Sequence, residues 1–190
     1  MKIKGTCEDK FIEVKELFTD LHKSEREVGS SYAVYKDGKP VVDIWGGYCD
    51  KDLKKEWSRD TLATVWSTTK GVAAITLAHA YENDLFDYEE KVAKYWPEFG
   101  CNGKEDITVG MLLSHQAGIC GSSANKVEDY YNQKIMADEL AKMAPLWEPG
   151  TASGYHSMTY GWLTSELMLR IAGKSLGRYF REEIADSNEI

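Results

Sequence analysis

The stretch Val65-Trp66-Ser67-Thr68-Thr69-Lys70-Gly71 opens the most apolar part of the chain. From Leu62 to Leu85 the sequence is dense in Ala, Val, Leu and Ile, and Lys70 is the lone charged side chain between Leu62 and Tyr81. This pattern predicts a helix from Ser67 to Tyr81 that is apolar on most of its faces and lies in the middle of a domain. A cation in such a helix needs a specific role.

The spacing of Ser67 and Lys70 favours nucleophilic catalysis. A serine hydroxyl is a weak nucleophile until a base removes its proton, and a lysine in a buried setting can be that base. In a helix, Ser-x-x-Lys places both side chains on one face, with the serine at the N-terminus, where the dipole favours developing negative charge. The structural alternative is that Ser67 caps the helix and Lys70 extends to the surface.

The same spacing occurs a second time, in Ser123-Ala124-Asn125-Lys126. This copy lies in a stretch rich in Gly, Ser and Asn, and its serine does not open an apolar helix. The sequence context therefore selects Ser67 over Ser123 as the nucleophile.

The rest of the chain predicts one hairpin and several helices. Asp37-Gly38 separates two β-branched and aromatic runs, and glycine supplies the positive φ that a tight turn needs. The expected elements are a helix at 11–27, strands at 31–35 and 41–45, short helices at 87–95 and at 107–115 with Thr108 as N-cap, and helices at 127–143 and 160–172. Because no linker or repeat is visible, we expect a single domain over 1–190. A lone hairpin is marginal as a sheet, so further strands should pair with it.

The composition excludes several classes of protein. Hydrophobic residues make up 43% and charged residues 28%, an ordinary globular balance. A net charge of −8 without a basic run argues against binding nucleic acid. The polar first ten residues and the lack of a long apolar segment predict no signal peptide and no membrane span, hence an intracellular, cytoplasmic protein. The four cysteines and four histidines do not cluster, so we expect no metal and no cofactor.

Four stretches along the chain together carry a family resemblance. They are, in order, Tyr35 to Gly47, Val65 to Gly71, Ile107 to Gly118, and Trp147-Glu148-Pro149-Gly150 with Tyr155-His156-Ser157 and Tyr160 to Leu163. They resemble segments of the β-lactamase-related serine hydrolases, which include class C β-lactamases, penicillin-binding-protein-like peptidases, esterases and animal β-lactamase-domain proteins. The resemblance covers nearly the whole chain and implies an α/β (α+β) fold of the β-lactamase/transpeptidase type.

The resemblance also implies roles for individual residues. Ser67 would be acylated, Lys70 would assist proton transfer, and Tyr155 would act as base toward Ser67 and toward the deacylating water. A tyrosine can do this only if nearby cations lower its pKa. Ser157, expected to take part in substrate binding, stands where class C enzymes have asparagine in Tyr-x-Asn, and this change favours small carboxylic esters over β-lactams.

Other candidate residues are assigned structural roles. Two literal Tyr-x-Asn strings, 81–83 and 130–132, lie in predicted helices and are not preceded by a Pro-Gly turn, so they are set aside. His115 is expected to form hydrogen bonds around a helix end. His156 should point away from the side of Tyr155 if that segment is extended.

One family motif has no counterpart in the sequence. The Lys-Thr-Gly or similar triad of the family lies on a later strand, which also donates one of two oxyanion-hole N–H groups. Losing one such donor costs about two to three orders of magnitude in rate. We therefore expect a truncated domain that lacks C-terminal strands of the sheet.

Three functional hypotheses follow. The leading one is a serine hydrolase that acts on a small ester or amide through an acyl-Ser67 intermediate, with the oligomeric state left open. The alternative is a catalytically inactive truncated or scaffold protein of the same family. A cell-wall carboxypeptidase would need an export signal, and none is visible.

Overall fold

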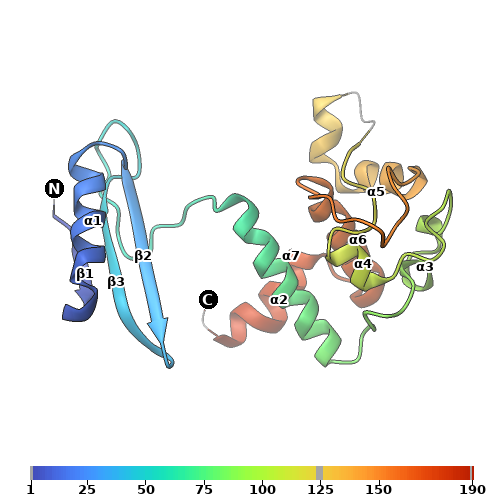
Figure 1. The fold of residues 1–190 in the computed structure, drawn as a ribbon, viewed down its shortest axis with the longest axis horizontal. Coiled ribbons are helices and arrows are strands. Elements are labelled where there is room, and N and C mark those ends of the chain that lie inside the picture. The colour runs from blue at the N-terminus through green and yellow to red at the C-terminus, as the bar shows by residue number, and fades with distance from the viewer. Residues whose placement is uncertain (1, 123–125, 189) are drawn as a thin grey trace. The chain divides into compact units, whose positions relative to one another are not determined.

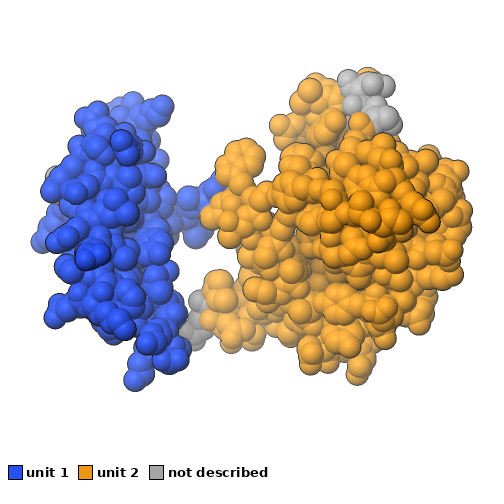
Figure 2. Space-filling model, viewed as in Figure 1, with its two compact units in different colours: residues 1–64 blue, residues 65–190 orange. Residues whose placement is uncertain are grey.

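The computed structural model describes residues 2–122, 126–188 and 190, so Ser123, Ala124 and Asn125 of the second Ser-x-x-Lys motif lie outside the described residues. The chain divides into two compact units, residues 1–64 and 65–190 (Figure 2). That both units belong to a single domain stays a prediction.

The first unit is a small antiparallel sheet with one helix, α1 (Ile12–Lys23) (Figure 1). Its strands are β1 (Lys4–Cys7), β2 (Gly29–Lys36) and β3 (Lys39–Gly47), in the spatial order β1-β3-β2. The predicted hairpin is present, and Asp37 and Gly38 both have positive φ, of 50° and 73°. These angles suit the type of two-residue turn that matches strand twist.

Two predictions for this unit were incomplete. β1 was not predicted, because Lys4-Gly5-Thr6-Cys7 is polar and shows no alternation of apolar residues, yet it pairs with β3. The helix predicted at 11–27 ends at Lys23. The hydroxyl of Ser24 donates to the carbonyl of Asp20, and Glu25 adopts φ 57°, so the chain leaves the helix there.

The core of the first unit is built around β3. Val41, Val42 and Ile44 are buried, and the side chains packed against them are Ile3, Cys7, Phe11, Phe18 and Val34. The core therefore joins β3 to the N-terminal strand and helix.

The second unit is helical, and its other helices pack around α6. Its helices are α2 (Thr69–Glu82), α3 (Val92–Tyr95), α4 (Val109–Leu113), α5 (Gln133–Lys142), α6 (Thr159–Ala172) and α7 (Leu176–Tyr179). Helix α6 contacts α2, α3, α4, α5 and α7 (Figure 1). Leu163, Leu167 and Met168 of α6 are buried in the same core as Trp96 and Phe99. Eight of its residues are buried, so this helix organises the unit.

Several helix predictions for this unit were correct. Helix α4 begins after Thr108, whose hydroxyl accepts a hydrogen bond from the Met111 N–H at 3.1 Å. The helix predicted at 160–172 is α6. The left-handed Gly173 follows it, as helix C-termini favour.

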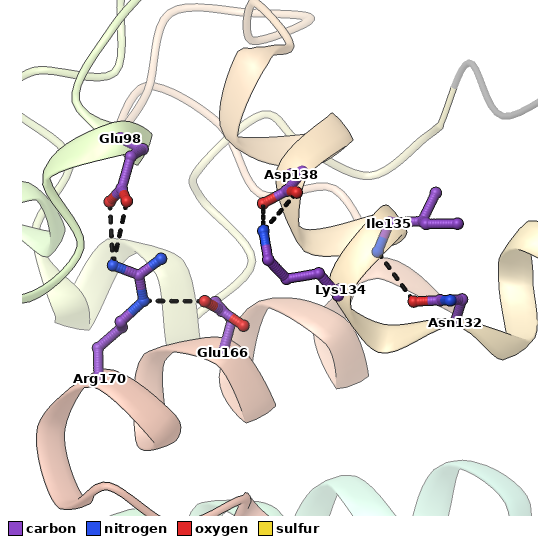
Figure 3. Close-up of polar contacts among 7 residues, drawn as sticks. All are labelled: Glu98, Asn132, Lys134, Ile135, Asp138, Glu166 and Arg170. Carbon is purple, nitrogen blue, oxygen red and sulfur yellow. Dashed lines mark hydrogen bonds and ion pairs between the residues drawn. The ribbon is translucent and has the colours of Figure 1, made fainter.

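Other predictions need correction. The helix predicted at 127–143 is divided into a 3-10 turn, Val127–Tyr131, and α5, because the Asn132 side chain caps α5 through the Ile135 N–H (Figure 3). Ser67 lies in a 3-10 turn, Trp66–Thr68, just before α2. Helix α2 buries Ala73, Thr76, Leu77 and Ala80 but leaves Ile75 61% exposed, so one face of it packs within this unit.

The segment after α6 was not predicted to be helical. After α7 it continues as a π-helical stretch, Phe180–Ala185, and a 3-10 turn, Asp186–Asn188. Its sequence mixes charged residues with apolar ones at helical spacing, Leu176, Tyr179, Phe180 and Ile184, so a periodic signal was present and was overlooked. Tyr179 and Ala185 are buried.

Candidate active site

Ser67 is exposed at the start of α2, on a strained turn. The preceding residue, Trp66, has φ 47°, in the left-handed region that costs a non-glycine residue about 1–2 kcal/mol. The 3-10 turn Trp66–Thr68 then leads into α2. Such strain clusters at functional sites, where the surrounding fold maintains it. Lys70 follows one turn later, and its Nζ donates to Ser67 Oγ at 3.3 Å.

Tyr155 reaches the same serine from a segment 88 residues away in the sequence. Its hydroxyl donates to Ser67 Oγ at 2.7 Å. Lys70 Nζ lies 4.9 Å from the centre of the Tyr155 ring. The three side chains that the sequence singled out for acyl transfer therefore meet at one point.

The surroundings of Tyr155 favour its ionised form. Hydrogen bonding with Ser67 and with Lys70, together with the positive charge of Lys70, lowers the pKa of Tyr155 below that of an ordinary tyrosine. The contact with Ser67 can run in either direction. A protonated Tyr155 donates to Ser67, and an ionised one accepts from the Ser67 hydroxyl.

Ser157 enters the site through its backbone. Its carbonyl oxygen accepts a hydrogen bond from Lys70 Nζ at 2.7 Å, while the residue itself is exposed. Lys70 thus spans from the α2 turn to the segment that carries Tyr155. A substrate-binding role for the Ser157 side chain stays a prediction.

The segment before Tyr155 has no regular secondary structure and is fixed by side chains and loop contacts. Trp147 Nε1 donates to the carbonyl of Ala152 at 3.0 Å, and the Gly150 N–H donates to the carbonyl of Gln116 at 3.1 Å. A Cβ on Gly154 would lie 2.4 Å from the Trp147 ring, so glycine is required where the chain passes this indole. Trp147 was recognised only as part of a resembling segment, without a role, and Gly154 was not singled out at all.

His156 is a structural residue of the core. It is fully buried, its Nε2 accepts from the Ile119 N–H at 3.1 Å, and its Nδ1 lies 2.6 Å from the Gly154 carbonyl. Nδ1 must therefore carry the proton, and burial lowers the pKa of the ring. Tyr155 is 57% exposed, so the two neighbours point in different directions, as expected for extended backbone.

His115 lies closer to the candidate site than the sequence indicated. It follows α4, as expected for a residue at a helix end, but its ring centre is also 5.2 Å from that of Tyr155 and 5.0 Å from that of Tyr160. Burial and the positive charge of Lys70 lower its pKa. The spacing of His115 in the sequence gave no sign of this contact, because it depends on how two distant loops meet.

The described residues contain no group of three His, Cys, Asp or Glu side chains that could hold a metal ion. All four cysteines are free. None of the helices in the described part of the chain has the length and apolar character needed to cross a membrane.

Comparison with known proteins places the chain in a family. The family model for beta-lactamase matches residues 14–188. The chain belongs to the beta-lactamase family. This confirms the family resemblance. The solved relatives confirm the predicted fold class, a mixture of helices and a small sheet that forms part of a β-lactamase/transpeptidase-like domain.

Several relatives of this beta-lactamase-family chain are known by sequence or structure. The esterase/beta-lactamase LipL of Mycobacterium tuberculosis is 38% identical over 185 residues, which cover 97% of this chain and 43% of LipL. A family VIII carboxylesterase structure has a TM-score of 0.90 and 42% identity, over 97% of this chain and 51% of that one. A penicillin-binding protein homologue from Caulobacter crescentus has a TM-score of 0.92 and 37% identity, over 98% of this chain and 51% of its own. The chain thus spans about half the length of these relatives.

Proposed function

We propose that this chain carries the acylation site of a serine hydrolase that acts on small carboxylic esters or amides. One observation carries the proposal: Ser67 Oγ lies 2.7 Å from the Tyr155 hydroxyl and 3.3 Å from Lys70 Nζ. A nucleophile within hydrogen-bond reach of a base, with a cation beside that base, is the arrangement that acyl transfer needs. Ser67 is the proposed nucleophile, Tyr155 the base and Lys70 the group that stabilises the tyrosinate.

The proposed reaction has two halves. In the first, ionised Tyr155 takes the proton of Ser67 as Oγ attacks the substrate carbonyl, and it then gives that proton to the departing alkoxide or amine. In the second, Tyr155 takes a proton from water, which attacks the acyl-Ser67 ester, and returns the proton to Ser67. The same residue acts as base and then as acid in each half.

Lys70 contributes charge and geometry to this reaction. Its ammonium group donates to Ser67 Oγ and to the Ser157 carbonyl, so it is held between the two segments that supply the nucleophile and the base. A fixed cation in this position favours the negative charge that moves onto Tyr155. The backbone carbonyl of Ser157 would make this contact with any side chain at that position.

Within this proposal, we expect the substrate to be an ester. This expectation is supported by relatives named as an esterase/beta-lactamase and as a carboxylesterase, and by serine in place of asparagine at position 157. An intracellular location is part of the same proposal. The four free cysteines support it, since thiols persist in reducing compartments.

A pair of chromogenic substrates tests the proposal. A p-nitrophenyl ester of a short-chain acid and a chromogenic cephalosporin are offered to the full chain, to Ser67→Ala and to Ser123→Ala as a control with the same Ser-x-x-Lys spacing. We expect faster hydrolysis of the ester, its loss in Ser67→Ala and its retention in Ser123→Ala. A rate that survives Ser67→Ala contradicts the proposal, a preference for the cephalosporin contradicts its ester part, and no hydrolysis of either supports the inactive or scaffold reading.

A further inference from the structure

We propose that His115 is a positioning residue that fixes the Tyr155 side chain against Ser67 by binding the peptide N–H groups on both sides of Tyr155. The inference rests on the proposed function, since it assigns His115 to the base of that site. No direct contact of His115 with a substrate is part of it.

The contacts of His115 enclose Tyr155. The N–H of Gly154 donates to the His115 carbonyl at 3.0 Å, and the N–H of His156 donates to His115 Nδ1 at 3.2 Å. The imidazole also packs on the Tyr155 ring, with centres 5.2 Å apart and planes tilted by 59°. One residue therefore binds the backbone before Tyr155, the backbone after it and the side chain between them.

Tyr155 needs such support because its segment has no regular secondary structure and its own side chain is exposed. Residues 152–156 form no helix and no strand, so no ladder of backbone hydrogen bonds fixes their dihedral angles. The Tyr155 side chain is more than half exposed and is not anchored by burial. Its hydroxyl must nevertheless stay within hydrogen-bond distance of Ser67 Oγ for proton transfer.

The backbone at His115 is shaped for this task. His115 has φ 66°, in the left-handed region that non-glycine residues rarely adopt. The N–H of the next residue, Gln116, turns back to the Met111 carbonyl at 2.8 Å, which closes the end of α4. Val109 and Leu112 anchor this short helix in the core. The strained turn at the end of this anchored helix thus directs both the carbonyl and the ring of His115 toward residues 154–156.

The hydrogen bond also determines the charge of His115. Nδ1 accepts an N–H, so the ring proton must lie on Nε2 and the ring must be neutral. The groups that face this ring are Lys70, Tyr155, His156 and Tyr160. Protonation of His115 would remove the acceptor that holds the backbone of His156 and would place a second cation near Lys70.

Three variants separate the acceptor from the ring. His115→Asn places an amide oxygen near the position of Nδ1 and tolerates the left-handed backbone. His115→Gln carries the same amide one bond further out, and His115→Phe keeps an aromatic ring but has no acceptor. Circular dichroism and thermal unfolding show which variants are folded. If His115→Phe does not fold, His115→Gln still tests the loss of the acceptor at the Nδ1 position.

The readout is the ionisation of Tyr155 itself, which needs no substrate. The full chain is labelled with 3-fluorotyrosine, its ¹⁹F resonances are followed with pH, and the Tyr155 signal among the eleven tyrosines is identified by its loss in Tyr155→Phe. We expect His115→Phe and His115→Gln to move the Tyr155 midpoint to higher pH and His115→Asn to stay close to the parent protein. In an ester assay the first two should lose about 100-fold in kcat, with KM little changed, because the base is misplaced.

Two results would overturn the inference. One is a Tyr155 midpoint that does not move in the folded His115→Phe or His115→Gln protein. The other is a Tyr155 midpoint that shifts as far in His115→Asn as in His115→Gln, since the position of the acceptor would then be irrelevant. A midpoint that shifts as expected in a protein that hydrolyses no ester supports the positioning role and refutes the proposed function, so the two failures are distinguishable.

Discussion

At Tyr155, a phenol that is ordinarily protonated at neutral pH lies against a serine hydroxyl and beside an ammonium group. The hydrogen bonds and the positive charge stabilise the tyrosinate, which lowers its pKa. Because only the tyrosinate can take a proton from Ser67, the proposed reaction should depend on pH through this one group. The rate should rise as pH increases through the pKa of Tyr155.

The first prediction concerns this pH dependence. Lys70→Met removes both the donor and the positive charge, so the pKa of Tyr155 rises and the ascending limb of kcat/KM for ester hydrolysis moves to higher pH. At neutral pH the rate falls for the same reason. Lys70→Arg keeps the charge and should move the limb less. A limb that stays in place in Lys70→Met would show that Lys70 does not control the ionising group.

The second prediction concerns the close passage of Gly154 past Trp147. A Cβ at Gly154 would lie 2.4 Å from the indole, so Gly154→Ala must displace the ring or the backbone beside Tyr155. We expect a loss of about 1–3 kcal/mol in the free energy of unfolding, measured in urea. Gly161→Ala is the matched control. Gly161 is exposed in α6 with open space around it, and alanine there should stabilise by about 0.5–1 kcal/mol. Equal effects of the two changes would contradict this account.

The sequence predicted which side chains would meet at Ser67 but not everything that holds them. Ser67, Lys70 and Tyr155 have side chains of recognisable chemistry in segments of recognisable order, so they could be singled out. The Ser157 carbonyl that binds Lys70 has no residue-type signature, because every residue carries one. The contacts of His115 with residues 154 and 156 arise from the meeting of two loops, which local patterns do not encode.

At the scale of elements, predictions succeeded where local chemistry decides the outcome. Thr108 caps α4 and Asp37-Gly38 turns the hairpin, as their side chains or dihedral angles dictate. Predictions failed where tertiary contacts decide. The polar β1 becomes a strand because β3 offers it an edge, and the long periodic stretch 127–143 is divided where Asn132 starts a new helix. The segment 176–188 is a different case, because Leu176, Tyr179, Phe180 and Ile184 recur at helical spacing and its local pattern does indicate the helix that forms.

The third prediction concerns an ion-pair network that joins α6 to the turn Pro97–Phe99 (Figure 3). Arg170 Nε donates to Glu166 at 2.9 Å, and its Nη1 donates to both carboxylate oxygens of Glu98, at 3.2 and 3.1 Å. The Glu166 side chain is only 4% exposed, whereas that of Glu98 is 61% exposed. The carboxylate of Glu166, which is largely shielded from water, therefore depends on the positive charge of Arg170 more than the carboxylate of Glu98 does.

Two substitutions separate these partners. Arg170→Met leaves a buried carboxylate without its cation, and we expect a loss of about 2–3 kcal/mol in the free energy of unfolding. Glu98→Gln removes only an exposed pair and should cost less than about 1 kcal/mol. Urea unfolding of both variants measures the difference. An Arg170→Met protein as stable as Glu98→Gln would mean that Glu166 does not need its partner.

At the scale of the whole molecule, all the proposed site residues belong to the second compact unit, residues 65–190. The matched family segment nevertheless begins at residue 14 and includes most of the sheet unit. The fold class could be predicted because four segments in a fixed order resemble one family. The division into two compact units was not predicted, because the change from the charged stretch 51–60 to the apolar stretch 62–85 was interpreted as the start of a buried helix and not as a boundary. The chain covers 51% of the carboxylesterase structure, so the activity of the whole protein is a proposal that only an experiment on the chain can test.

The most direct test of the central claim is to locate the serine that reacts with a fluorophosphonate. The full chain is treated with the reagent, which transfers its phosphonyl group to an activated serine with loss of fluoride, and is then digested with trypsin. The account predicts an adduct on Ser67 in the peptide from Asp60 to Lys70, absent in Ser67→Ala and formed more slowly in Tyr155→Phe. An adduct on the peptide from Glu105 to Lys126, which contains Ser123, or labelling that survives in Ser67→Ala, would contradict it.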